Sequence, residues 1–454
     1  MRILLIQQYH HSPDCPASCR HYDLAERWSR RHKVTIISST AWEERRLTDE
    51  YPWIPGSAEL QRIPTPYSNK MGLTARANAF LSFAFGAFRT GRMLPAPDVV
   101  IGSSTPLTAA WAARRLARKW NVPFVFEVRD LWPDFPIDMG AIPKPFQAPL
   151  KYLERSLYRS ADHVVALSPD IANHIAETGV PRDRITTLLH GTDLQAAAEA
   201  VVLSRRQPGP EESRPPAPKT RTVLYAGAFG RANDIPTILA AARKLSADRR
   251  IRFLFAGHGF HEDTIREAAS ELPNVELIGP VPRHRIFDLF ANAFVSLVTF
   301  ADVPSVAACS PSKMYDSLAA GCPVIVNSDG WTRRLVEENR CGWYVRAESP
   351  DQLAERLVTL VESPEQATAA ASNAVRAARD GFDRGLIADR LEALLESAVA
   401  ARKPTADAEP TPGPTGAARA TGIAFRETAA AAPATKEPTT ETPATRDSRV
   451  SEAA

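Results

Sequence analysis

Residues 310–326 read SPSKMYDSLAAGCPVIV and predict a complete helix followed at once by a buried strand. Ser310 is expected to cap the helix, because its hydroxyl can accept a backbone N–H of the first turn. Pro311 suits the first helical position, where its missing N–H costs nothing. Gly321 suits the left-handed residue that ends a helix, and CPVIV then forms a short apolar strand rich in β-branched residues.

Strand-like and helical stretches alternate along the chain on both sides of this unit. The first series of strands is expected at 2–9, 33–39, 98–104, 123–130, 162–168 and 184–190, with helices that include 21–31 and 107–120. The second series is expected at 221–229, 251–259, 275–281, 294–300 and 322–328. This alternation predicts the α/β class, with two parallel sheets that are each covered by helices on both faces.

The length of 454 residues is more than one hydrophobic core needs, so two domains and flanking segments are expected. We expect the domains at 1–200 and 221–381, and a linker or excursion rich in proline and charge at 201–220. Residues 402–454 are dominated by Ala, Pro, Thr and Glu. That composition cannot bury a core, so this tail is predicted to be disordered.

Charge and cysteine content exclude several classes of protein. The net charge of +3 gives no reason to expect a nucleic-acid partner. The five cysteines are odd in number, and Cys15 and Cys19 lack the second pair that a zinc site would need. Free thiols in a reducing cytoplasm fit best. We therefore predict a cytoplasmic protein with no metal site.

The N-terminal apolar run is too short for a signal peptide, and no stretch reaches the roughly 20 apolar residues that cross a bilayer. The longest apolar run is 77–88, between Arg76 and Arg89. It fits a buried helix, and it also fits a helix that lies on a membrane surface, because such helices combine aromatic residues with basic flanks.

Two stretches of the second series suit a phosphate. In YAGAFGRANDIPTI (225–238), two glycines flank a turn after a strand, and Arg231 beside it could make a bidentate phosphate contact. Lys313 and Asp316 are three residues apart, share one helix face and lie near a helix N-terminus, which favours anions. The simpler interpretations are a solvated arginine at an ordinary turn and a surface ion pair.

The strand at 124–128 is followed by Arg129, Asp130 and Trp132, which are expected at the carboxyl end of the sheet. An internal pair of Arg129 with Asp130 or Glu127 is one interpretation, and a catalytic or substrate-binding carboxylate is the other. No G-x-G-x-x-G follows the first strand, and no P-loop motif occurs, which disfavours NAD-dependent and P-loop enzymes.

Taken together, these stretches resemble the family 4 glycosyltransferases of the GT-B fold, and most of all the WbuB-like bacterial branch that builds surface polysaccharides. The resemblance covers about residues 1–400 and rests on an ordered set of pieces: FEVRDLWP (126–133), ADHVVALSPDI (161–171), HGTDL (190–194), YAGAFGR (225–231), NVELIGPVP (274–282) and PSKMYDSLAAGCPVIV (311–326). It implies two Rossmann-like domains that face each other across a cleft, and a helix at 382–401 that crosses back to the N-terminal domain.

The resemblance also implies a reaction. Such enzymes transfer a hexosyl or N-acetylaminosugar group from a nucleotide-sugar, usually with retention, and they need no metal or other cofactor because basic side chains stabilise the leaving diphosphate. By similarity, Gly230, Arg231, Lys313 and the backbone after Ser310 would bind that diphosphate. These roles match the electrostatics of the helix N-terminus.

The nucleoside contacts follow from the same resemblance. Asp316 falls where the family usually has a glutamate that binds the ribose hydroxyls, and Val281 would face the base. The donor is expected to be UDP-linked.

The chain departs from the family pattern in the loop after the first strand, which reads SPDCPASCR in place of a glycine-rich loop, and at two further positions. Arg129 occupies the place of a common histidine, which leaves Asp130 as the candidate catalytic contact to the acceptor, together with Arg129. Ala308 stands where the family has a glutamate that contacts the donor sugar.

The family branch implies an acceptor that is a saccharide, carried on a lipid at the inner face of the cytoplasmic membrane, and a role in lipopolysaccharide or exopolysaccharide synthesis with peripheral membrane contact. Two alternatives remain open. Ala308 and Arg129 favour a non-catalytic scaffold that binds a nucleotide-sugar. A nucleotide-sugar 2-epimerase shares the GT-B architecture, although its set of acid and base residues is not identified in this sequence.

Overall fold

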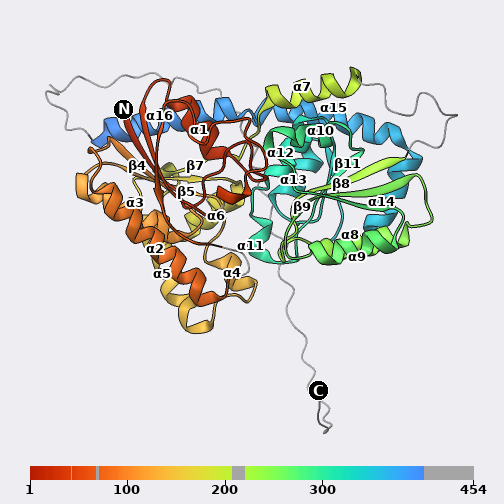
Figure 1. Cartoon of the computed structure of the whole chain (residues 1–454), viewed down its shortest axis with the longest axis horizontal. Helices are drawn as coiled ribbons and strands as arrows, with labels where there is room; N and C mark the ends of the chain where they lie inside the picture. Colours follow the sequence, from red (N-terminus) through yellow and green to blue (C-terminus); the bar gives the residue numbers. More distant parts are fainter. Residues whose placement is uncertain (42, 68–70, 207–219, 403–454) are drawn as a thin grey trace, which may run out of the picture. The chain divides into compact units, whose positions relative to one another are not determined.

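The computed structural model describes residues 1–41, 43–67, 71–206 and 220–402, and these residues contain two separate parallel sheets (Figure 1). We call the part built on the first sheet the N-terminal lobe and the part built on the second sheet the C-terminal lobe. The two Rossmann-like sheets confirm the α/β class and the GT-B type of architecture.

The sheet of the N-terminal lobe has seven strands in the order β3-β2-β1-β4-β5-β6-β7, all paired in parallel. The strands are β1 (Arg2–Ile6), β2 (Lys33–Ser39), β3 (Glu59–Ile63), β4 (Val99–Ser103), β5 (Phe124–Val128), β6 (His163–Ala166) and β7 (Ile185–Thr187). The helices are α1 (Arg20–Trp28), α2 (Leu73–Gly91), α3 (Leu107–Trp120), α4 (Asp134–Asp138), α5 (Lys144–Ser160) and α6 (Pro169–Glu177), with 3-10 turns at Glu43–Arg45 and Arg182–Arg184.

The sheet of the C-terminal lobe has six parallel strands in the order β10-β9-β8-β11-β12-β13. They are β8 (Arg221–Ala228), β9 (Ile251–His258), β10 (Val275–Gly279), β11 (Val295–Val298), β12 (Val324–Val326) and β13 (Gly342–Tyr344). The helices are α7 (Leu194–Arg206), α8 (Ile235–Lys244), α9 (Glu262–Glu271), α10 (Ile286–Ala291), α11 (Pro304–Ala307), α12 (Ser312–Ala319), α13 (Trp331–Glu338), α14 (Pro350–Glu362) and α15 (Pro364–Gly381), with a 3-10 turn at Arg283–Arg285.

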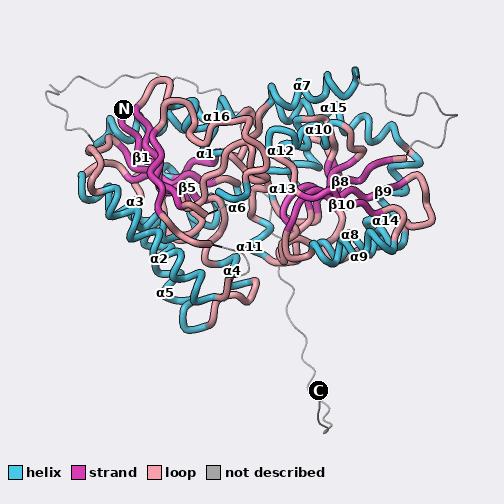
Figure 2. Tube along the Cα trace, viewed as in Figure 1, coloured by secondary structure: helices cyan, strands magenta, loops and turns pink. Residues whose placement is uncertain are grey.

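Each sheet is buried on both faces, as Figure 2 shows for the strands between their covering helices. In β1, Leu4 and Ile6 belong to one hydrophobic core, while Ile3 and Leu5 belong to another on the opposite face. The strands of the other sheet divide in the same way between two cores. This is why the strands are nearly continuous apolar runs, with helices above and below them.

The strand order places a topological switch point in each sheet. In the first sheet, the chain leaves β1 on one side towards β2 and returns on the other side at β4. In the second sheet, β8 lies between β9 and β11 in the same manner. Ligands of open α/β sheets bind outside the carboxyl ends of the strands at such points. A binding site is therefore expected at the loops after β1, β4, β8 and β11.

The helix that follows residue 310 starts later than the sequence predicts. The helix α12 begins at Ser312, with Pro311 at the N-cap position and no side-chain cap, so the assignment of Ser310 as the cap is wrong. The hydroxyl of Ser310 instead makes a hydrogen bond of 2.7 Å with the hydroxyl of Tyr315. The expected left-handed end is confirmed, since Gly321 has φ +71°.

Two edge strands, β3 and β13, were not predicted from the sequence. β3 has only one buried residue, Ile63, and β13 has none, so neither shows the apolar run that marks the central strands. The expected linker also differs at its start, because α7 continues to Arg206. The rest of the expected linker, 207–219, and the tail from 403 onward lie outside the described residues.

The last helix, α16 (Arg384–Arg402), packs against α1 of the N-terminal lobe. The indole N–H of Trp28 donates to the carbonyl oxygen of Ala388 at 3.2 Å, and Arg27 pairs with Asp389. Leu391 and Leu395 complete the core on this face of the first sheet. None of the described helices is long and apolar enough to span a membrane.

We expect Leu395→Ala to lower the free energy of unfolding by about 2–5 kcal/mol, because the fully buried side chain leaves a cavity between α16 and the first sheet. The matched control is Leu386→Ala in the same helix, where the side chain is 55% exposed and the change should stay within about 0.5 kcal/mol. Denaturant unfolding of both variants measures the difference. Equal effects would show that α16 does not belong to the core of the N-terminal lobe.

Candidate functional site

The most unusual group of the C-terminal lobe is the ammonium of Lys313, in the first turn of α12. Its Nζ atom is buried and has no hydrogen-bond partner among the described residues. It lies 3.8 Å from the ring centroid of Tyr225 on β8, and burial lowers the pKa of Lys313 to about 7. A buried cation without an acid is costly, so this position suits an anionic ligand that supplies the missing charge.

The end of β8 lies beside Lys313, and a hydrogen bond holds the loop that follows it. Gly227 has φ +134°, a conformation that favours glycine, and a Cβ there would lie 3.6 Å from the Lys313 side chain. The backbone N–H of Gly230 donates to Oδ1 of Asn233 at 3.2 Å. Arg231 is exposed, and its guanidinium lies 4.1 Å from the ring centroid of Phe260. The loop therefore presents a second cation at the carboxyl end of β8.

Asp316 is buried one turn after Lys313 and accepts two hydrogen bonds through the same oxygen. Oδ1 receives the hydroxyl of Thr192 at 2.7 Å and Nη2 of Arg283 at 2.5 Å. The interpretation of Lys313 and Asp316 as a surface ion pair is wrong, because both groups are buried and Asp316 pairs with Arg283. Val281, two residues before Arg283, is half-buried against the core of the C-terminal lobe.

At the first sheet, Glu127 of β5 organises a buried polar cluster. Its carboxylate accepts from Nε of Arg20 at 2.9 Å, from His21 at 2.5 Å and from the hydroxyl of Ser103 at 2.9 Å. Burial by itself raises the pKa of Glu127, but His21 and Arg20 outweigh it and hold the pKa well below its usual value. Glu127 is therefore ionised and supports the ends of β4 and β5.

Arg129 and Asp130 follow β5 directly. The backbone N–H of Arg129 donates to the hydroxyl of Ser104, whereas its Nε atom is buried with no partner among the described residues. Among those residues, no salt bridge joins Arg129 to Asp130 or to Glu127, so the internal pair considered from the sequence is wrong. Arg129 is thus a third cation at a strand end, and among the described residues no carboxylate lies within salt-bridge distance of it, although its charge helps to lower the pKa of Glu127.

Asp130 receives a weak hydrogen bond of 3.4 Å from the hydroxyl of Thr105. It also lies beside the thiol of Cys309, which comes from the C-terminal lobe. Burial and the neighbouring Asp130 carboxylate raise the pKa of Cys309 well above its usual value. Ala308, which replaces the glutamate of the family pattern, is buried against the core of the N-terminal lobe, and its carbonyl oxygen accepts from Ser168 at 2.6 Å.

Sequence reasoning missed several polar residues at these strand ends. Both amide atoms of Gln8 and the Nδ1 atom of His11, in the loop after β1, are buried without a partner among the described residues. Burial lowers the pKa of His11 to about 3, so its imidazole is neutral and can accept a hydrogen bond. Their signal was the polar run QQYHH at the end of a strand. No comparable sequence pattern marks Thr192 and Arg283, because only their contact with Asp316 in the folded chain brings them to the site.

Among the described residues, two groups could hold a metal by ligand geometry alone: Asp134 with Glu154 and His174, and His32 with Glu392 and Glu396. Each already contains a cation, since Lys151 lies 2.8 Å from Asp134 and Arg31 lies 2.6 Å from Glu392. We assign no metal to either group.

Comparison with known proteins places the two lobes in related families. Residues 9–191 match the glycosyl transferase 4-like domain, and residues 210–377 match the glycosyl transferases group 1 domain. A D-inositol 3-phosphate glycosyltransferase of Thermobispora bispora is 26% identical over 321 residues, which cover 66% of this chain and 72% of that protein.

Solved structures share the fold. Sucrose-phosphate synthase from Thermosynechococcus elongatus superposes with a TM-score of 0.67 at 16% identity, covering 88% of this chain and 99% of that one. Anabaena HepE in complex with UDP-glucose superposes with a TM-score of 0.61 at 16% identity, covering 87% of this chain and all of that one.

Because the pKa of Lys313 is lowered, we expect the binding of an anion to be coupled to the uptake of a proton. In the free protein its ammonium loses the proton near pH 7, whereas a bound diphosphate would stabilise the charged form and raise the pKa. Binding of UDP at pH 8 should therefore take up close to one proton, and affinity should fall as the pH rises above 7. A terminal phosphate, whose second pKa is about 6, is already ionised at pH 8 and does not obscure the effect.

Calorimetry of UDP binding in buffers with different ionisation enthalpies measures this uptake. The Lys313→Met variant should bind with no uptake. Binding without uptake by the unmodified protein would show that Lys313 does not meet the diphosphate.

Proposed function

The chain belongs to the glycosyltransferases with the GT-B fold, and we propose that it is a retaining enzyme that transfers a sugar from a nucleotide-sugar to a saccharide acceptor. We propose a UDP-linked donor, no metal or other cofactor, and a role in the assembly of a surface polysaccharide on a lipid-linked acceptor. The UDP-glucose complex of the structural relative HepE supports the choice of donor.

The buried, unpaired ammonium of Lys313 is the observation that carries the proposal. Transfer leaves a nucleoside diphosphate, whose negative charge grows in the transition state and needs a counter-charge placed in advance. Lys313 supplies one such charge, Arg231 supplies another, and the N–H groups after Ser310 add partial positive charge. Gly230 would contribute its N–H once the ligand displaces Oδ1 of Asn233, which accepts from it in the free protein. This set can replace a metal ion.

The nucleoside would lie next to this diphosphate site. Asp316 would bind the ribose hydroxyls, since a carboxylate is an acceptor of the right kind for a diol. Val281 would contact the base. The position of Asp316 one turn after Lys313 suits a ligand that joins a diphosphate to a ribose.

The acceptor would bind at the strand ends of the N-terminal lobe. Asp130 would contact the acceptor hydroxyl, and Arg129 would contribute an unpaired cation beside it. The neutral imidazole of His11 offers a further hydrogen-bond acceptor. At the other side of the cleft, Ala308 offers no carboxylate to the donor sugar, so the sugar must be held by other groups.

Thermal stabilisation by a panel of UDP-, GDP-, dTDP- and ADP-sugars tests the donor site, because a ligand that binds the folded state raises its apparent stability. We expect one nucleotide class to raise the melting temperature, and Arg231→Ala and Lys313→Met to lose most of the shift. Lys313→Met should also lower kcat for transfer or donor hydrolysis by about 10²–10³-fold. The control is Arg243→Ala, which removes only an exposed pair with Glu271.

The same experiment separates an enzyme from a scaffold. Stabilisation by a nucleotide-sugar without transfer to any acceptor and without hydrolysis would favour the non-catalytic scaffold that Ala308 suggests. Conversion of the donor into its 2-epimer would favour the epimerase. No stabilisation of a folded sample by any donor would contradict the proposal.

Exposed apolar side chains on two helices of the N-terminal lobe support membrane contact. On α2, Leu73, Leu81 and Phe85 are 46%, 49% and 59% exposed and share one face, since they are separated by eight and four residues. On α5, Phe146 and Tyr152 are 59% and 77% exposed. The run at 77–88 thus buries one face in the protein and exposes the other.

Basic residues surround these side chains, as an anionic lipid surface requires. They include Arg89 at the end of α2, Arg115 on α3, and Lys144 and Arg155 on α5. Arg115 lies over Trp111, whose ring also contacts Phe85. This combination of exposed aromatics and cations favours the headgroup region of an inner membrane rather than a spanning segment.

Flotation with vesicles that contain phosphatidylglycerol tests this part. We expect the protein to float with them, and Leu81→Ser with Phe85→Ser to weaken the association at least about tenfold, because two apolar side chains lose their burial in lipid. Leu203→Ser on α7, which removes an equally exposed leucine from the C-terminal lobe, should change nothing. Failure to float with or without anionic lipid would refute membrane contact.

A further inference from the structure

Arg283 is a buried arginine with unused hydrogen-bond donors. Its exposed fraction is 8%, and only Nη2 is engaged by a side chain, through the bond to Oδ1 of Asp316. Nε and Nη1 are buried and have no partner among the described residues. The Cζ atom of the guanidinium lies 5.3 Å from the ring centroid of Phe287. Donors buried in this way are costly unless a ligand accepts from them.

In Asp316, the partner of Arg283, only one of the two carboxylate oxygens accepts hydrogen bonds from the described residues. Thr192 and Arg283 both donate to Oδ1 of Asp316, and among the described residues none donates to Oδ2. Oδ2 of Asp316 can therefore still accept a hydrogen bond, and Nε and Nη1 of the neighbouring Arg283 can still donate one. A hydroxyl group is both a donor and an acceptor, so it can satisfy both at once.

We propose that Arg283 binds the ribose of the donor nucleotide together with Asp316, and that the pair selects ribonucleotides over 2′-deoxyribonucleotides. Asp316 would accept from the ribose hydroxyls through Oδ2, and Nε or Nη1 of Arg283 would donate to a hydroxyl oxygen. A deoxyribose removes one hydroxyl and leaves buried polar atoms unpaired. This inference rests on the proposed donor site and adds Arg283 and the class of nucleotide to it.

The backbone around Arg283 is held by the N-terminal lobe. The N–H groups of Arg283 and His284 donate to the carbonyl oxygens of Cys15 and Pro13 at 3.1 and 3.2 Å. These carbonyls belong to the loop after β1, on the acceptor side. The backbone of Arg283 is thus held by the N-terminal lobe, and its guanidinium is held by Asp316 of the C-terminal lobe.

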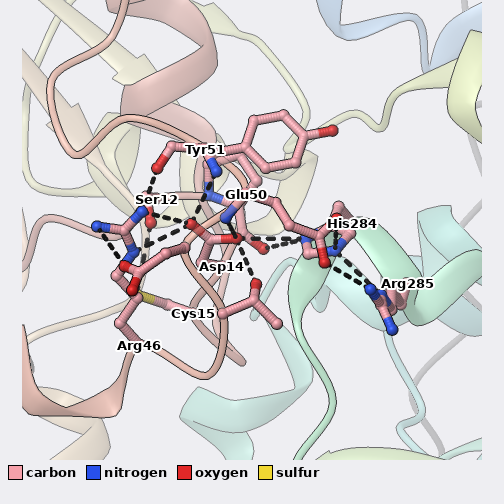
Figure 3. Close-up of polar contacts among 11 residues, drawn as sticks. Ser12, Asp14, Cys15, Arg46, Glu50, Tyr51, His284 and Arg285 are labelled. Atoms are coloured by element: carbon pink, nitrogen blue, oxygen red, sulfur yellow. Dashed lines mark hydrogen bonds and ion pairs between the residues drawn. The ribbon is translucent and has the colours of Figure 1, made fainter.

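Asp14 fixes that loop, as Figure 3 shows. Its buried carboxylate accepts from the hydroxyl of Thr48 at 2.5 Å, the backbone N–H of Tyr51 at 3.0 Å and the guanidinium of Arg46 at 2.9 Å. The segment that contains Tyr51 also reaches the C-terminal lobe, because Glu50 accepts from Arg285 at 2.5 Å. The ribose pocket therefore has a rigid support outside α12.

The test compares the affinities of UDP, GDP and ADP with those of their 2′-deoxy counterparts by calorimetry. For the nucleotide that binds, we expect the unmodified protein to prefer the ribose form by about 10–100-fold, the effect of one unpaired buried polar group. Arg283→Ala should reduce this preference to within a few-fold. Arg283→Lys keeps a cation beside Asp316 but lacks the fork of donors, so it should fold and still lose most of the preference.

Thr192→Val is the matched control, because it removes the other donor to the same oxygen of Asp316 and leaves Arg283 in place. It should keep the ribose preference even if overall affinity falls. An equal loss in Thr192→Val and Arg283→Lys would show that both act only by orienting Asp316, which would overturn the proposal.

Failure of this inference is distinguishable from failure of the proposed function. Equal binding of ribose and deoxyribose forms by the unmodified protein would overturn the role of Arg283 and leave the nucleotide site intact. No binding of any nucleotide in either form would overturn both.

Discussion

A parallel sheet that is buried on both faces leaves only the ends of its strands for polar chemistry. Both sheets of this protein obey that constraint, since the residues of β1 and β8 alternate between two hydrophobic cores. The groups considered for the site lie at strand ends, in the loops that follow them or in the next helix, as Asp316 does in α12. The two cores of each sheet hold the strand ends rigid, and this rigidity allows uncompensated charges to persist there.

The charges at the strand ends are distributed unevenly. The buried carboxylates are engaged: Glu127 by Arg20 and His21, Asp14 by Arg46, and Asp316 by Arg283. The cations Lys313 and Arg129 are not, since each has a buried nitrogen without a partner among the described residues. Because unpaired buried charge costs free energy, this asymmetry favours a negatively charged ligand group at Lys313, such as a diphosphate, and an oxygen-rich acceptor at Arg129.

The architecture could be predicted from the sequence because it depends on local periodicity. The helix at 107–120 and eleven of the thirteen described strands could be predicted as apolar runs. β3 and β13 could not, because β3 (ELQRI) is mostly polar and β13 (GWY) has only three residues. The cap at Ser310 was wrong for a similar reason. A hydroxyl has several local partners, and the choice of Tyr315 over the helix backbone depends on tertiary packing.

The same distinction between local patterns and tertiary contacts applies to the site residues. Lys313, Arg231 and Asp316 could be named from motifs, but their electrostatic state could not, since it depends on what surrounds them. A surface ion pair between Lys313 and Asp316 was one of the two interpretations that the sequence allowed. In the structure, Asp316 instead pairs with Arg283, 33 residues away, and the ammonium of Lys313 lies against the ring of Tyr225. Long-range contacts of this kind have no signature in a single sequence.

The contacts between the lobes bear on how the two substrates would meet. Cys309 of the C-terminal lobe lies beside Asp130, and the loop of Arg283 is bonded to the loop after β1. In both places, a segment that carries a residue proposed for one substrate thus contacts a segment of the other lobe. An acceptor that shifts the loop after β1 would also shift Arg283, and with it the guanidinium that meets Asp316. Donor and acceptor affinities should then be thermodynamically coupled, since each ligand changes the other's affinity by the same factor.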